Sequence, residues 1–118
     1  MRDLPQARGA EAEAQAAQFL VRQGLRIVAR NYRTRLGEVD VIAREGATLV
    51  FVEVRARRSL AFGGAAGSVD RAKQRRIVAA ARHYLGRLGS EPSCRFDVLA
   101  WQGADAEPAW IRGAFDVG

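Results

Sequence analysis

The chain has 118 residues, 48% of them hydrophobic and 27% charged, which is typical of one folded domain and excludes a disordered chain. No apolar run approaches the ~20 residues of a membrane-spanning helix, and "AAQFLV" is followed at once by Arg22, so neither a membrane segment nor a signal peptide is expected. The single cysteine, Cys94, cannot form an internal disulfide. We expect it to be a small core residue, and we expect a cytoplasmic protein.

The net charge of +6 is concentrated in one part of the chain. Residues 55–95 contain ten Lys and Arg against two acids, a balance of +8, whereas the rest has nine basic and eleven acidic residues, a balance of −2. A one-sided basic surface favours polyanions, with nucleic acid ahead of an anionic membrane. The alternative is a solvated face without a partner.

The N-terminal half is predicted to contain one helix and three strands. Residues 1–8 are expected to be a flexible leader, followed by a single domain over 9–118. An Ala-rich helix is predicted over 9–23, with Gly24 ending it. Strands are predicted over 25–33, 38–44 and 48–56, the last two joined by a tight turn at Glu45-Gly46.

The C-terminal half begins with a Gly-rich connector, 57–68, that we expect to be a loop beside a site. Ser68 can cap a helix over 69–88, and a strand over 94–101 follows. Residues 109–115 form a short last element whose type the sequence does not assign. The order α-β-β-β-α-β plus this element predicts an α/β (α+β) fold with a mixed central sheet flanked by helices.

Three carboxylates lie inside the second and third predicted strands, where acids are unusual. A turn at Glu45-Gly46 would place Glu38 opposite Glu53, with Asp40 on the same face. Like charges opposed in a sheet are destabilising, and a cation such as Mg²⁺ or Mn²⁺ would resolve the conflict. A salt-bridge cluster in which Arg55 offsets the repulsion is the structural alternative.

Both predicted helices add a charged residue to an apolar stripe. Glu13 shares a face with Ala16 and Leu20 by the i, i+3, i+7 rule. Lys73 is in line with Ile77 and other apolar residues of the second helix. Buried charges need partners, so we expect the acidic cluster to pair with Lys73 and the same cation to hold Glu13.

These motifs resemble the PD-(D/E)XK nuclease core and, over nearly the whole chain after residue 8, the YraN-like family of uncharacterised bacterial proteins. The stretches that carry this resemblance are "GAEAE…A…FL" (9–20), "RNYR…GEVDVIA" (30–43), "VFVEVRAR" (50–57), "GSVDRAKQRR" (67–76), "RFDVLAW" (95–101) and "AF" (114–115). The resemblance implies a restriction-endonuclease-like core, similar to that of Holliday-junction resolvases.

It also implies that Asp40 and Glu53 bind a metal and that Glu13 completes the site from the first helix. The lysine of the superfamily falls at Arg55, which remains charged and can position or stabilise charge but is a poor base. Lys73, the chain's only lysine, is the candidate substitute.

The resulting hypothesis is a metal-dependent endonuclease that hydrolyses DNA phosphodiester bonds, with branched DNA and a homodimer suggested by the resemblance. The alternative is a non-catalytic module that binds nucleic acid or protein on a nuclease fold. The expected catalytic residues are Glu13, Asp40, Glu53, Arg55 and Lys73; the expected metal ligands are Asp40, Glu53, Glu13 and Glu38; the expected nucleic-acid contacts are Arg71, Lys73, Arg75, Arg76 and Arg82.

Overall fold

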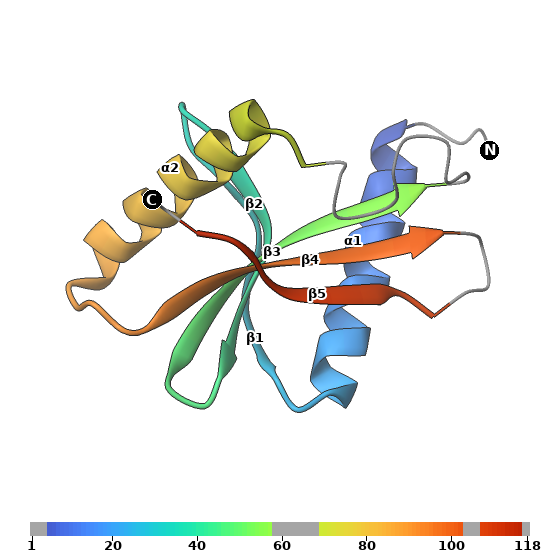
Figure 1. The fold of residues 1–118 in the computed structure, drawn as a ribbon, viewed down its shortest axis with the longest axis horizontal. Helices are drawn as coiled ribbons and strands as arrows, with labels where there is room; N and C mark the ends of the chain where they lie inside the picture. Colours follow the sequence, from blue (N-terminus) through green and yellow to red (C-terminus); the bar gives the residue numbers. More distant parts are fainter. Residues whose placement is uncertain (1–4, 58–68, 103–106, 117–118) are drawn as a thin grey trace.

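Five strands form one mixed sheet in the computed structural model, which describes residues 5–57, 69–102 and 107–116 (Figure 1). The strand order is β1-β2-β3-β4-β5, with β3 and β4 parallel and the other neighbours antiparallel. This confirms the predicted α/β (α+β) fold with a mixed sheet and two flanking helices. The elements are α1 (Pro5–Arg22), β1 (Arg26–Arg33), β2 (Glu38–Glu45), β3 (Thr48–Arg57), α2 (Arg71–Leu88), β4 (Cys94–Gln102) and β5 (Ala109–Phe115).

The two helices cover opposite faces of this sheet, and α1 passes behind β3, β4 and β5 in Figure 1. Strand β3 shows the reason, because its side chains alternate between the faces. Val50 and Val52 pack toward Leu20 of α1, whereas Phe51 packs toward Ile77 of α2. Burial of both faces explains why β3 is a nearly continuous apolar run.

Helix α1 begins at Pro5, four residues before the predicted start, so the expected leader over 1–8 is partly helical. Proline suits a first helical turn because its fixed φ is helical and its missing N–H has no partner there anyway. The predicted stop at Gly24 is confirmed: this residue has a φ of +97°, in the left-handed region that favours glycine.

Helix α2 begins at Arg71, two residues later than predicted, and its N-cap is Asp70. The Asp70 carboxylate accepts a hydrogen bond from the Lys73 backbone N–H at 2.8 Å, which satisfies one of the free donors of the first turn. Ser68, the expected cap, lies outside the described residues, as does most of the Gly-rich connector.

The predicted β2–β3 register is wrong by two residues. The turn is Gly46-Ala47, so Glu45 pairs with Thr48 and Val41 with Val52. Gly46 has a φ of +61°, which a tight hairpin turn requires and glycine adopts without strain. A shift of two preserves the alternation of faces, but it removes Glu38 from its predicted position opposite Glu53.

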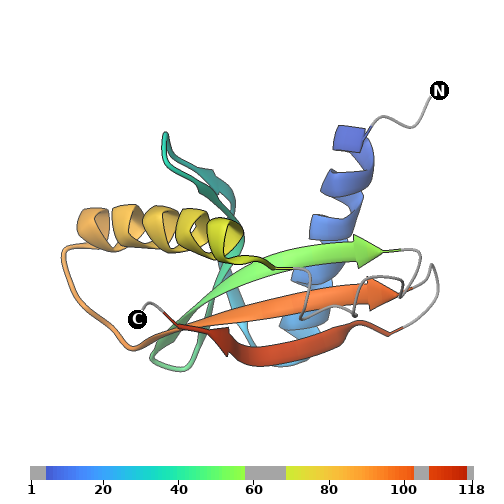
Figure 2. The same cartoon turned by 45° about the horizontal axis from the view of Figure 1, so that its top comes forward.

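Strand β2 also separates from β3 beyond the Val41–Val52 pair, while it stays paired with β1 as far as Glu38. The outer part of the β1–β2 hairpin therefore rises away from the sheet beside α2 (Figure 2). Val39, which alternation would place with Val41 on the α1 face, packs in the core cluster under α2 instead.

The unassigned C-terminal element is β5, an edge strand antiparallel to β4. Cys94, expected in the core, is exposed at the start of β4. Within the part of the chain that the structure describes, neither helix is long and apolar enough to span a membrane.

Candidate functional site

Asp40 occupies the point where β2 leaves β3. Its carboxylate oxygen Oδ2 accepts a hydrogen bond from the Val54 backbone N–H at 2.9 Å. Strand separation deprives that N–H of a partner in the neighbouring strand, and a buried N–H requires one. The same geometry that opens the sheet therefore fixes the Asp40 side chain in the gap.

Glu53 lies beside Asp40 and is only 3% exposed. Its Oε2 is 3.5 Å from Nζ of Lys73 and 3.4 Å from a guanidinium nitrogen of Arg55. Burial, followed by the Asp40 charge, raises the pKa of Glu53 to about 7, and the Lys73 charge offsets part of that rise. The pairing expected between Lys73 and the acidic cluster is thus present.

Glu13 reaches the cluster from α1, on the other side of the sheet. Burial and the neighbouring Asp40 charge raise the pKa of Glu13, and a hydrogen bond with the Asn31 side chain opposes the rise. Asn31 has a φ of 56°, a left-handed conformation that asparagine tolerates better than most residues. Asn31 is a site residue that the sequence reasoning missed, because its position depends on this backbone bend.

The cluster of Glu13, Asp40 and Glu53 has Asp40 at its centre, since the other two carboxylates each interact with Asp40. Glu38 is not part of it in the described structure. Its side chain is 41% exposed and forms an ion pair with Arg33 at 3.4 Å. The cause is the two-residue register difference, which puts Asp40 rather than Glu38 near Glu53.

A divalent cation is the group that such a cluster would hold. The described residues contain no set of three or more Asp, Glu, His or Cys side chains already arranged as metal ligands. Mg²⁺ does not need such a cage, because it usually binds one or two carboxylates and takes water and substrate phosphate oxygens for its other positions. Asp40 and Glu53 are adjacent hard oxygen donors, so they fit this cation with Glu13 as the nearest additional carboxylate.

The basic face predicted for the second helix lies on α2, where the predicted contacts Arg71, Arg75, Arg76 and Arg82 are all exposed, as is Arg87. Lys73 belongs to the same helix but turns inward to Glu53 and keeps 30% of its side chain exposed. The acidic cluster and the arginine face are therefore adjacent, because Lys73, which contacts the cluster, lies within one helical turn of Arg75 and Arg76.

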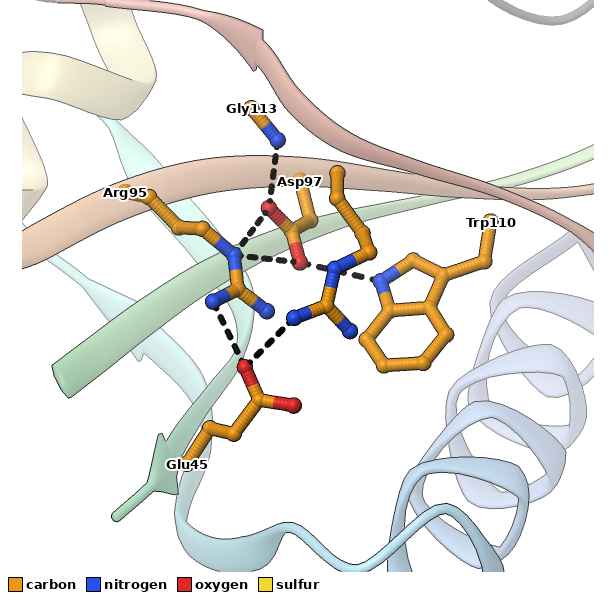
Figure 3. Close-up of polar contacts among 6 residues, drawn as sticks. Glu45, Arg95, Asp97, Trp110 and Gly113 are labelled. Atoms are coloured by element: carbon orange, nitrogen blue, oxygen red, sulfur yellow. Dashed lines mark hydrogen bonds and ion pairs between the residues drawn. The ribbon is translucent and has the colours of Figure 1, made fainter.

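A second polar cluster, formed by β4, β5 and the end of β2, was missed in the sequence (Figure 3). Its centre is Asp97, which is fully buried and accepts hydrogen bonds from Nε of Arg95, Nε1 of Trp110 and N of Gly113 at 2.9–3.2 Å. Arg95 also donates to Glu45 at 2.7 Å. Since Trp110 and Gly113 of β5 both donate to Asp97 of β4, this cluster ties the edge strand β5 to the sheet. The signal in the sequence was an acid inside the apolar strand "RFDVLAW".

The fold and site define an α+β protein with a five-stranded mixed sheet that brings three carboxylates and a lysine together beside a basic helix. The model of the uncharacterised protein family UPF0102 matches residues 12–101. The chain belongs to this family, which confirms the expected YraN-like membership. The matched residues include Glu13, Asp40, Glu53 and Lys73 and end before β5.

Relatives in the same family match almost the whole chain. A UPF0102 protein of Cupriavidus taiwanensis is 55% identical over 112 residues, which cover 94% of this chain and 84% of the relative. A UPF0102 protein of Psychromonas ingrahamii is 47% identical, with coverage of 92% and 88%. A UPF0102 protein of Methylobacillus flagellatus is 49% identical, with coverage of 91% and 95%.

Proposed function

We propose that this protein is a metal-dependent endonuclease that hydrolyses phosphodiester bonds in DNA. One observation carries the proposal: the contact between Asp40 and the buried Glu53 at the point where β2 and β3 separate. Two carboxylates in such a place repel each other when both are ionised. A bound cation would remove this repulsion, so a cation-binding role explains why the fold keeps two carboxylates together here.

Asp40 and Glu53 would hold Mg²⁺ or Mn²⁺, with Glu13 close to the same position. A bound divalent cation would supply an activated water and stabilise charge on the leaving oxygen. The Val54 N–H fixes one Asp40 oxygen, which orients the carboxylate before a cation or a substrate arrives. Val54 thereby acts through Asp40 and has no direct part in the reaction.

Lys73 and Arg55 would stabilise the negative charge that develops on the attacked phosphate. Both cations lie within 3.5 Å of Glu53, so they are already directed to the cluster. A guanidinium is a poor general base, which leaves Lys73 as the better candidate for moving a proton at its Nζ.

The arginines on the exposed side of α2 would contact the DNA backbone without reading its sequence. Reversal of charge at Arg75 and Arg76 should therefore weaken binding to all DNA sequences alike and reduce the dependence of affinity on salt. Branched DNA as the substrate, a homodimer and a cytoplasmic location belong to the same proposal.

A binding module without cleavage is the second candidate, and two observations favour it. Residue 55 is Arg where the nuclease superfamily has Lys. Glu53 also already has ion pairs with Lys73 and Arg55, which would have to rearrange for a cation to bind.

Titration of Mg²⁺ or Mn²⁺ with duplex, single-stranded and four-way DNA separates the two candidates when binding and cleavage are scored independently. Cleavage that requires the ion and is lost in Asp40→Ala, with affinity retained, supports the endonuclease. Binding to all three DNAs without cleavage at any ion concentration supports the module.

A further inference from the structure

The turn between β1 and β2, residues 34–37, presents one large apolar side chain to solvent. Leu36 is 73% exposed, the highest value among the exposed large hydrophobic residues of the described structure. The turn is at the tip of the hairpin that projects away from the sheet beside α2 (Figure 2). A single exposed leucine is common on protein surfaces, so its meaning depends on how it is held and on its neighbours.

Hydrogen bonds to Thr34 hold the turn in one conformation. The Thr34 hydroxyl oxygen accepts from the backbone N–H groups of Leu36 and Gly37, both at 3.1 Å, and the hydroxyl donates to the Gly37 carbonyl at 2.9 Å. The Thr34 N–H donates to that same carbonyl at 2.8 Å. Leu36 is therefore presented on a preorganised turn, which lowers the entropy cost of using it as a contact.

The turn is also packed against the basic helix. Gly37 is buried, and a Cβ at this position would collide with the backbone carbonyl of Arg76. This close approach places Leu36 next to the exposed arginine face of α2. Arg33 and Arg35 are exposed on either side of the turn residue Thr34.

We propose that Leu36 is a wedge that inserts between DNA bases at a step where stacking is already weak. The inference rests on the proposed DNA-binding function and deepens it, because it names the substrate class: duplex DNA with a local break in stacking, such as a nick or a mismatch. The surrounding arginines would bind the phosphates of both strands, and the leucine side chain would lie between two bases that no longer stack on each other.

The chemistry favours DNA over a protein partner. Apolar side chains inserted from a basic surface are a common means of unstacking and kinking DNA. The cost of opening a base step is smallest where the step is already disrupted, so a wedge produces a preference for damaged or interrupted duplexes. A protein-binding apolar patch would instead need several neighbouring hydrophobic side chains.

The experiment compares binding of the full chain, in EDTA, to three DNAs: an intact duplex, the same duplex with a central nick, and the same duplex with a central mismatch. A 2-aminopurine base beside the lesion reports unstacking by its fluorescence. We expect tighter binding to the two disrupted DNAs, with a fluorescence rise. Leu36→Ser should reduce this preference about tenfold, an effect at the lower end of the range seen when an aromatic side chain stacked on a base is replaced.

Leu36→Met, which keeps an apolar side chain, should retain the preference. Val21→Ser is the matched control, since Val21 is 55% exposed but lies on α1, which packs on the opposite face of the sheet from α2. If Leu36→Ser binds all three DNAs as the wild type does, with the same fluorescence change, the wedge is wrong while DNA binding itself stands. If the wild type binds none of these DNAs, the wedge is wrong, and the proposed function falls as well if the protein also fails to bind four-way DNA with Mn²⁺.

Discussion

Replacement of Glu53 by Gln should make the metal-free protein more stable above neutral pH. The folded state holds the Glu53 proton more tightly than the unfolded chain does, because its pKa is about 7 instead of the ordinary 4.5. Folding stability due to that proton is fully present below pH 4.5 and is lost as the pH rises through about 7. At ~1.4 kcal/mol per pH unit, the ionised Glu53 costs about 3 kcal/mol at alkaline pH.

Glu53→Gln removes this cost while keeping the shape of the side chain. We expect its advantage in unfolding free energy to be close to zero near pH 4.5 and to grow to about 3 kcal/mol above pH 8, roughly 10 °C in melting temperature. Urea unfolding in EDTA at several pH values measures the difference between variant and wild type. Glu38→Gln is the control, because Glu38 pairs with Arg33 outside the cluster and should give a much smaller change. An advantage of Glu53→Gln that stays constant with pH would refute the electrostatic reasoning.

Three further predictions address the cation, the turn and the buried network. Millimolar Mn²⁺ or Mg²⁺ should raise the melting temperature of the wild type but not of Asp40→Asn/Glu53→Gln, because a ligand stabilises the state that binds it. Equal shifts in both proteins would contradict cation binding at Asp40 and Glu53. Gly37→Ala should destabilise the fold by about 1–3 kcal/mol in urea unfolding, since the added Cβ would collide with the Arg76 backbone carbonyl. Unchanged stability would mean that the β1–β2 turn can shift away from α2 without loss of free energy. Asp97→Asn should destabilise the fold by about 1–3 kcal/mol, because it removes the charge of a fully buried carboxylate that accepts hydrogen bonds from Arg95, Trp110 and Gly113. Hydrogen exchange should show β5 opening first, and uniform loss of protection would argue against a local role.

Much of the fold follows from local patterns in the sequence. The end of α1 shortly before Gly24 and the order of helices and strands depend on residue type and spacing, which a single sequence displays. The turn at Gly46-Ala47 was misplaced because "REGATL" allows two alternative two-residue turns, and only the packing of the whole sheet decides between them.

The site was predictable as far as it depends on side-chain alternation and helix faces. Asp40 and Glu53 remained together since a two-residue slip keeps both on their side of the sheet. The contribution of Asn31 depends on its left-handed backbone conformation in β1, and the loss of Glu38 depends on the β2–β3 register; residue spacing reveals neither. The Asp97 network requires the pairing of β4 with β5, a tertiary contact beyond the reach of local patterns.

The proposed endonuclease activity makes a prediction for Lys73, because Arg55 occupies the position at which the resemblance to PD-(D/E)XK nucleases implies a lysine. Lys73→Met should lower cleavage more than it lowers DNA binding, whereas Arg55→Lys should preserve or raise cleavage. A bound divalent cation would itself lower the pKa of a water molecule at this site, so residual turnover in Lys73→Met is expected.

The most direct test of the central claim is single-turnover cleavage of one four-way DNA at saturating Mn²⁺, with affinity measured in parallel. The wild type should cleave, and Asp40→Asn and Glu53→Gln should bind with nearly unchanged affinity but lose cleavage by orders of magnitude. Cleavage that persists in both variants, or DNA binding by every variant without any cleavage by the wild type, would contradict the assignment of this carboxylate pair as the centre of a nuclease.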